Sequence, residues 1–140
     1  MILLDTNVVS ESFRPRPSEI VQAWYRAQAE DDLFLCTPVL AELRYGVERL
    51  PEGARRNRLE KVIDSMEERF IDRILPVDRN AAHEFGRIVA GRTQIGRPFE
   101  TMDGLIAAIA LSHRAVIATR DVSDFERVGL ELINPFVPHV

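Results

Sequence analysis

Four acidic residues stand beside apolar stretches of the chain: Asp5, Glu42, Asp103 and Asp121. Asp5 and Asp121 follow short apolar runs, whereas Glu42 and Asp103 interrupt the apolar pattern of two amphipathic segments. An ionised carboxylate near a core costs free energy unless a partner stabilises it. Because few basic residues lie beside most of these four, their pattern predicts a divalent cation as the shared partner.

An ordinary structural role is also open to each of the four acids. Asp5 and Asp121 stand where aspartate often caps a following helix. Asp103 falls in the first turn of a predicted helix, where a negative charge complements the helix dipole. Glu42 has arginines nearby in its own helix. All four nevertheless lie on the sheet-facing side of their elements, and this favours one common site.

Short apolar runs alternate with longer amphipathic segments, which is typical of an α/β fold. Strands are predicted at 2–4, 33–36, 74–77, 115–119 and 130–133. Helices are predicted at about 7–13, 18–30, 37–50, 54–69, 78–94 and 101–113, with Ser18, Thr37, Asp78 and Thr101 as caps. Ligands gather outside the carboxyl ends of parallel strands, and both Asp5 and Asp121 fall there.

Helical spacing assigns further positions to the core. The residues expected to face inward include Ile20, Val21, Trp24 and Tyr25, and then Leu59, Val62, Ile63 and Met66. Beside Asp103, the small residues Gly104, Ala107 and Ala108 predict a close approach of that helix to the sheet. Segments 37–50 and 54–69 together predict a helical hairpin.

Composition limits the other possibilities. The chain has 140 residues, a length that indicates one domain, 1–140. Its formal charge of −4 does not by itself indicate nucleic-acid binding. Cys36 is the only cysteine, so an intramolecular disulfide and a cysteine-rich zinc site are excluded. No signal peptide and no apolar run long enough to cross a bilayer is evident, so we expect a cytoplasmic protein without a membrane partner.

Four sequence motifs resemble those of the PIN-domain ribonucleases. They are ILLDTN at 2–7, AELRYG at 41–46, DGLIAA at 103–108 and TRDVSDF at 119–125. Their order and intervals, over essentially the whole chain, are similar to the VapC-type toxins of bacterial type II toxin–antitoxin pairs and to their FitB-like branch. The resemblance implies a three-layer PIN-like fold in which helices flank a central parallel sheet of order 3-2-1-4-5.

The same resemblance implies a metal-dependent endoribonuclease that hydrolyses RNA phosphodiester bonds with Mg²⁺ or Mn²⁺. Asp5, Glu42, Asp103 and Asp121 match the metal-binding, catalytic carboxylates, and Asp124 is an alternative to Asp121 as the fourth acid. Residues expected to orient these acids or their water are Thr6, Asn7 and Thr119. Residues expected to contact RNA, from their closeness to the motifs, are Arg44, Arg97 and Arg120.

Partners follow from the resemblance as well. It implies a VapB-type antitoxin whose C-terminal segment blocks the acidic pocket, and we expect an apolar groove between the third and fourth helices as its seat. DNA binding is expected only through the antitoxin. The family also implies a homodimer.

Two other classes remain open at this point. One is a Mg²⁺-dependent phosphoryl-transfer or receiver-like domain, although a receiver needs a late lysine and Lys61 is the only lysine here. The other is a catalytically silent PIN-like binding module. Mn²⁺ titration separates the second from a nuclease, because a silent module binds the metal weakly or not at all.

Overall fold

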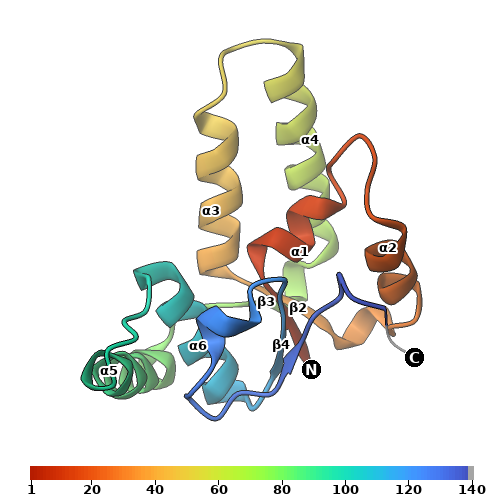
Figure 1. The fold of residues 1–140 in the computed structure, drawn as a ribbon. Helices are drawn as coiled ribbons and strands as arrows, with labels where there is room; N and C mark the ends of the chain where they lie inside the picture. Colours follow the sequence, from red (N-terminus) through yellow and green to blue (C-terminus); the bar gives the residue numbers. More distant parts are fainter. Residues whose placement is uncertain (139–140) are drawn as a thin grey trace.

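The computed structural model describes residues 1–138, which fold as helices around a small central sheet (Figure 1). The strands are β1 (Ile2–Leu4), β2 (Leu33–Cys36), β3 (Ile74–Leu75), β4 (Val116–Ala118) and β5 (Leu132–Ile133). The α-helices are α1 (Thr6–Glu11), α2 (Glu19–Arg26), α3 (Thr37–Glu48), α4 (Ala54–Arg69), α5 (Arg79–Gln94) and α6 (Thr101–His113). Short 3-10 helices are η1 (Glu30–Asp32), η2 (Ile71–Arg73) and η3 (Val122–Phe125). The end of the predicted domain 1–140, His139 and Val140, lies outside the described residues.

The sheet has the strand order β3-β2-β1-β4-β5, and every neighbouring pair is parallel. The predicted order 3-2-1-4-5 is therefore confirmed. In the register of the central strand, Leu3 is opposite Phe34 of β2 and Ile117 of β4. Since β1 and β4 are parallel neighbours, the residues that follow them meet at one edge of the sheet.

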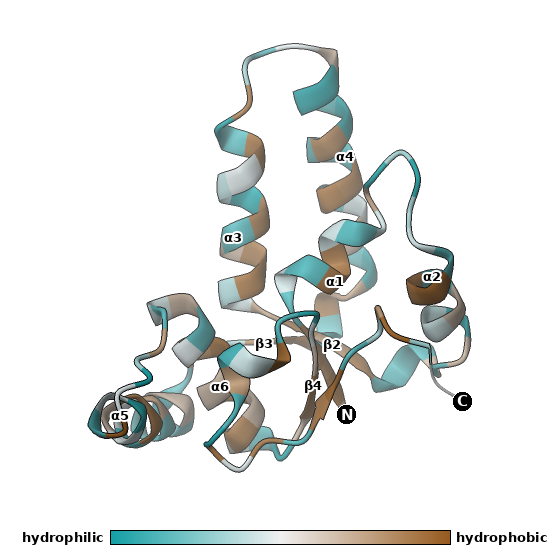
Figure 2. Cartoon of the chain, viewed as in Figure 1, coloured by the Kyte–Doolittle hydropathy of each residue, from teal (hydrophilic) through white to brown (hydrophobic). Residues whose placement is uncertain are grey.

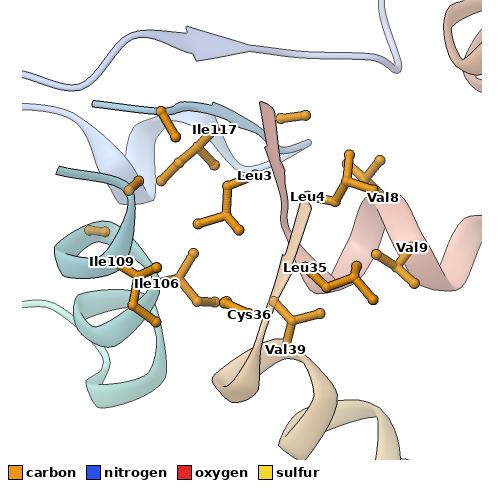
Figure 3. Close-up of a cluster of buried hydrophobic side chains, with 14 of the residues drawn as sticks. Leu3, Leu4, Val8, Val9, Leu35, Cys36, Val39, Ile106, Ile109 and Ile117 are labelled. Atoms are coloured by element: carbon orange, nitrogen blue, oxygen red, sulfur yellow. The ribbon is translucent and has the colours of Figure 1, made fainter. Parts of the chain in front are cut away.

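Side chains of β1 alternate between the two faces of the sheet, as the strand period requires. Leu3 points toward Ile106 and Ile109 of α6, whereas Leu4 points toward Val8 of α1 (Figure 3). All five side chains are almost completely buried. Helices thus cover both faces of the sheet, which confirms the predicted three-layer architecture.

Helices α3 and α4 form the predicted hairpin, which extends away from the sheet (Figure 1). Hydrophobic residues of both helices lie along the space between them (Figure 2), and Leu43, Val47 and Ile63 are buried. Arg44 links the two helices from the outside, with its Nη2 atom 2.7 Å from Asp64 Oδ1 and 2.6 Å from Glu67 Oε2.

Two predicted core positions are wrong: Ile20 and Val62 are both exposed. Val62 lines two open grooves beside α4, so this apolar side chain is not covered by another element. Ile20 lies in the first turn of α2, where Val21 and Trp24 take the buried face.

Two predicted caps are also wrong, because Thr37 and Thr101 are the first residues of their helices. The preceding residues, Cys36 and Glu100, have the extended backbone of a cap and make no side-chain capping bond. The caps at Ser18 and Asp78 are confirmed by bonds to the main-chain nitrogens of Val21 and Ala81. Helices α1 and α2 end earlier than predicted, at 11 and 26, and β3 to β5 are shorter.

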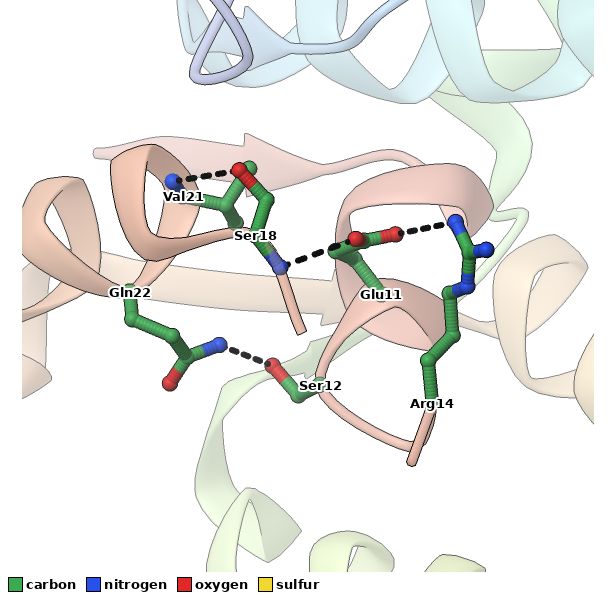
Figure 4. A network of polar contacts seen from close by, with 6 residues as sticks. All are labelled: Glu11, Ser12, Arg14, Ser18, Val21 and Gln22. Atoms are coloured by element: carbon green, nitrogen blue, oxygen red, sulfur yellow. Dashed lines mark hydrogen bonds and ion pairs between the residues drawn. The ribbon is translucent and has the colours of Figure 1, made fainter. Parts of the chain in front are cut away.

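The connection between α1 and α2 is held by a buried acid, Glu11 (Figure 4). Its Oε1 accepts a hydrogen bond of 3.1 Å from the main-chain nitrogen of Ser18, and its Oε2 lies 3.3 Å from Nη1 of Arg14. The Ser18 hydroxyl in turn caps α2, so one carboxylate fixes both ends of the connection.

No helix within residues 1–138 is both long enough and apolar enough to cross a membrane.

Candidate active site

The carboxyl ends of β1 and β4 bring the first and last sequence motifs together. Asp5 follows β1 directly, and its main-chain nitrogen donates to the carbonyl of Ala118 at the end of β4 (2.9 Å). Thr119 and Asp121 continue from that point. The sheet edge therefore joins residues that are more than a hundred positions apart in the chain.

Asp5 is only 5% exposed, yet its carboxylate meets only uncharged donors within residues 1–138. The main-chain nitrogen of Thr6 lies 2.8 Å from Oδ1, and the hydroxyl of Thr119 lies 2.7 Å from Oδ2. Burial raises the pKa of Asp5, and repulsion from Glu42 and Asp121 raises it further, although the bonds from Thr119 and Thr6 oppose this. Asp5 caps α1 and belongs to an acidic cluster at once.

Glu42 reaches this edge from the second turn of α3. Its Oε1 accepts a hydrogen bond of 2.7 Å from the hydroxyl of Thr6. The ordinary alternative for Glu42, an ion pair with an arginine of its own helix, is not what the structure shows. Arg44 is bonded to α4 instead. Thr6 therefore connects Glu42 to Asp5, because its hydroxyl donates to Glu42 and its main-chain nitrogen donates to Asp5.

Asp103 has a strongly raised pKa. Desolvation raises its pKa to about 7, and repulsion from Asp5, Asp124, Glu42 and Glu100 adds to the effect. Its carboxylate makes no hydrogen bond or ion pair with any residue in the range 1–138. Three of the four predicted acids, Asp5, Glu42 and Asp103, are therefore close enough to repel one another.

Gly104 explains how Asp103 is brought to this position. A Cβ atom at residue 104 would lie 3.0 Å from Phe85 and 3.0 Å from Val89, both in α5. The small residue therefore admits α5, and the prediction that it serves the approach of α6 to the sheet is wrong. Ala107 and Ala108 are fully buried, as expected.

Asp121 and Asp124 lie on a turn at the rim of the cluster. Asn7 links Asp121 to Asp5, since its Nδ2 atom is 2.9 Å from Oδ2 of Asp121 and 3.3 Å from Oδ2 of Asp5. Asp121 repels Asp5, whereas Asp124 repels Asp103. The two acids thus face different members of the cluster, and both border it.

The three uncharged residues expected to orient the acids do contact them. Thr119 bonds to Asp5 and also accepts from the main-chain nitrogen of Asp121 (3.0 Å). Asn7 accepts from the main-chain nitrogen of Arg120 (3.1 Å), which fixes its amide between the two strand ends. Thr6 bonds to Glu42 through its hydroxyl and to Asp5 through its main chain.

The arginines expected to contact RNA have other partners. Arg44 belongs to the α3–α4 hairpin. Arg97 donates to the carbonyl of Ser123 (3.0 Å) and lies 3.5 Å from Glu126. Arg120 stacks over the ring of Phe136, with its Cζ atom 5.2 Å from the centroid. No arginine is bonded to the four acids within residues 1–138, and the RNA contacts stay a prediction.

The donor set of this cluster suits a hard divalent cation. Its ligands are oxygen atoms only, as Mg²⁺ and Mn²⁺ prefer. Within the part of the chain described, no three acidic, histidine or cysteine side chains already stand close enough to hold a metal ion by themselves. Mg²⁺ does not require this, because it commonly keeps several waters and takes one or two carboxylates. The unpartnered Asp103 beside the buried Asp5 fits that mode.

Comparisons with known proteins show which family this chain belongs to. The family model described as PIN domain matches residues 2–130. VapC ribonuclease Y4jK of Sinorhizobium fredii is 41% identical and matches 99% of this chain and 99% of its own length. Toxin FitB of Neisseria gonorrhoeae is 39% identical over 97% of this chain and 99% of its own.

Among solved structures, FitAB bound to an IR36 DNA fragment covers 100% of this chain and 99% of the matched chain. Its TM-score is 0.94 at 37% identity. The chain belongs to the PIN-domain family, and the resemblance predicted from the four motifs is confirmed.

Proposed function

We propose that this chain is a Mg²⁺- or Mn²⁺-dependent endoribonuclease and the toxin of a type II toxin–antitoxin pair. The observation that carries the proposal is the unpartnered carboxylate of Asp103, which stands beside the buried carboxylate of Asp5 at the carboxyl edge of the sheet. Two neighbouring carboxylates removed from water repel each other, and a bound cation would relieve this repulsion. The ribonuclease and toxin names of the relatives supply the substrate class and the biological role.

In the proposed mechanism, Asp5 and Asp103 would hold the metal ion, and Glu42 and Asp121 would complete the acidic site around it. A bound divalent cation supplies Lewis-acid polarisation of a phosphoryl oxygen and makes a water molecule more acidic. Thr119 and Asn7 keep the Asp5 carboxylate oriented, and Thr6 does the same for Glu42. Hydrolysis in which water adds to phosphorus, the P–O3′ bond breaks and a proton passes to the departing 3′ oxygen would leave a 5′-phosphate and a 3′-hydroxyl. Asp124 serves as a further acid on the Asp103 side.

The antitoxin has a suitable seat in this protein. A groove of about 870 Å³ begins at Thr6 and Glu42 and continues between α1, α3 and α4. Leu59 and Val62 line its apolar part, and this is the groove expected from the hairpin. An amphipathic segment bound there reaches the acidic cluster directly. DNA binding through the antitoxin is consistent with the FitAB–DNA structure, and a homodimer stays a prediction.

Metal binding separates this enzyme from a catalytically silent PIN-like module. We expect 5 mM MgCl₂ or 1 mM MnCl₂ to raise the melting temperature at pH 7.5 by roughly 5 °C, because a ligand at ten times its Kd stabilises by about 1.4 kcal/mol. The Asp5→Ala and Asp103→Ala variants should lose this shift. A wild-type protein with no shift in either metal supports the silent module.

RNA cleavage is tested by sequencing RNA 5′ ends from cells that briefly express the protein. Wild type should create new 5′-phosphate ends at recurrent sites, and Asp5→Ala and Asp103→Ala should not. Asp31→Ala is the matched control, because Asp31 is an exposed acid at the amino end of β2, away from the cluster. Identical ends in all samples, with folding and expression verified, contradict the nuclease.

A further inference from the structure

Arg92, near the end of α5, is a charged residue that the sequence motifs do not mark. It is 4% exposed, and a guanidinium buried to this extent costs free energy unless its donors are satisfied. Nε donates to the carbonyl of Arg97 (2.6 Å), and Nη1 donates to the carbonyls of Asp124 (3.1 Å) and Glu126 (3.0 Å). The guanidinium also stacks on Phe99, 4.0 Å from the ring centroid.

These carbonyls belong to two segments that border the acidic cluster. One segment, 95–100, is the connection from α5 to α6, and α6 carries Asp103 in its first turn. The other is the turn 121–126, which includes η3 and carries Asp121 and Asp124. Three hydrogen bonds from the Arg92 side chain to main-chain carbonyls therefore join the segment before Asp103 to the turn that carries Asp121 and Asp124.

The charge of Arg92 is also placed toward the cluster. Burial and the neighbouring Arg97 lower the pKa of Arg92, while Asp124, Asp103 and Glu126 oppose that change by attraction. Arginine nevertheless stays charged in proteins. The guanidinium is thus a fixed cation within electrostatic reach of Asp103 and Asp124. Within residues 1–138 it donates to main-chain carbonyls and forms no ion pair with either carboxylate.

We propose that Arg92 is a positioning residue of the metal site, which holds the turn 121–126 so that Asp121 and Asp124 face Asp5 and Asp103. The inference rests on the proposed function, because it assigns a purpose to the geometry of that site. Arginine is required because its planar fork donates to several carbonyls at once, whereas lysine offers a single point of charge.

Arg73 provides a matched control within the same chain. Its side chain is 17% exposed, its Nε donates to the carbonyl of Leu33 (2.9 Å), and its guanidinium lies 4.7 Å from the ring of Phe70. It resembles Arg92 in chemistry, but it lies at the amino ends of β2 and β3, away from the acidic cluster, where it is 3.7 Å from Glu30 and 3.7 Å from Asp31. Its removal reports the cost of losing a partly buried arginine, with these two long ion pairs, outside the metal site.

The experiment compares Arg92→Met, Arg92→Lys and Arg73→Met with wild type. Mn²⁺ affinity is measured by calorimetry, kcat and KM are measured on RNA, and hydrogen exchange of residues 119–127 is measured without metal. The exchange readout includes the Asp124 amide, which donates to the carbonyl of Asp121 (3.0 Å). It reports the order of the turn independently of catalysis.

For Arg92→Met we expect the Mn²⁺ Kd to rise about tenfold or more, which is typical when a residue that orients metal ligands is lost. We also expect kcat to fall by a similar factor, KM to stay within about threefold and the Asp124 amide to exchange faster. For Arg92→Lys we expect a Mn²⁺ Kd, a kcat and an Asp124 exchange rate between those of wild type and Arg92→Met. Arg73→Met should lower the melting temperature without changing the Kd.

A folded Arg92→Met with wild-type Mn²⁺ affinity and wild-type exchange overturns the inference. If that variant does not fold, Arg92→Lys decides by the same two measurements. A wild-type protein that neither binds Mn²⁺ nor cleaves RNA contradicts the proposed function instead. In that case, unchanged exchange in the Arg92 variants shows separately that Arg92 does not hold the turn.

Discussion

Glu11 and Asp5 are two buried carboxylates only six positions apart, and the fold treats them differently. Each is 5% exposed. Glu11 receives a main-chain hydrogen bond from Ser18 and lies beside the positive charge of Arg14. Asp5 receives only uncharged donors and is surrounded by other acids. Equal burial therefore does not mean equal electrostatic satisfaction.

The difference separates an acid that stabilises the fold from acids to which we assign a chemical role in the proposed function. Glu11 has its partners within residues 11–18, so its charge is already used in holding α1 and α2 together. Asp5 and Asp103 repel each other, and within residues 1–138 no basic side chain forms a hydrogen bond or ion pair with either carboxylate. Repulsion of this kind is typical of a functional site, and a bound cation would relieve it.

Neutralising Asp103 gives the largest effect that this comparison predicts. Asp103→Asn should lower kcat/KM for RNA by more than about a hundredfold, since we propose Asp103 as a metal ligand and not merely as a support for one. The metal-free protein should be at least as stable as wild type, because the lost carboxylate has no hydrogen bond to break. Activity assays and thermal melting in EDTA measure the two effects. Full activity in Asp103→Asn contradicts its assignment to the site.

Removing Glu11 should have the opposite signature. Glu11→Ala leaves the main-chain nitrogen of Ser18 without its acceptor, so the free energy of unfolding should fall by about 2 kcal/mol. kcat/KM should remain within about threefold of wild type at 20 °C, because Glu11 does not touch the acidic cluster. Urea denaturation and RNA cleavage measure these quantities.

Arg14→Ala is the control that divides the two partners of Glu11. The Arg14 side chain is 64% exposed, so its ion pair should contribute under about 1 kcal/mol. The comparison fails if Glu11→Ala is as stable as wild type, or if Arg14→Ala costs as much as Glu11→Ala.

Local sequence signals predicted the part of this molecule that depends on short-range order. Asp5 and Asp121 follow apolar runs, and the parallel pairing of β1 with β4 brings those positions together. The caps at Ser18 and Asp78 depend on residues three positions away, and they were predicted as well. The strand order came from the resemblance of the motifs to a family, since no local pattern states which strands pair.

Long-range side-chain contacts could not be predicted in the same way. Arg92 meets carbonyls 32 and 34 positions later, and nothing in its flanking sequence distinguishes it from an exposed arginine of an amphipathic helix. Glu11 falls in the same class. Gly104 signalled close packing, but only the structure shows that α5 is the partner. Tertiary placement decides these roles, and the local pattern does not contain it.

A further, small predicted effect is the pH dependence of the metal-free protein. The folded pKa of Asp103 is about 7, above its ordinary value of 3.8. Between these values the native state keeps a proton that the unfolded state has released, so stability falls as the pH rises toward 7. Because water partly screens this half-buried carboxylate, the loss between pH 5 and 7 should be on the order of 1 kcal/mol.

Asp103→Asn isolates this contribution, since the variant cannot titrate at that position. Urea denaturation in EDTA at pH 5, 6 and 7 should show a decline for wild type that is smaller in Asp103→Asn, and saturating Mn²⁺ should remove most of the difference at pH 7. Parallel curves for wild type and Asp103→Asn would mean that Asp103 titrates near its ordinary pKa, and the contrast between Glu11, which has an arginine beside it, and the acids of the cluster would then rest on Asp5 alone.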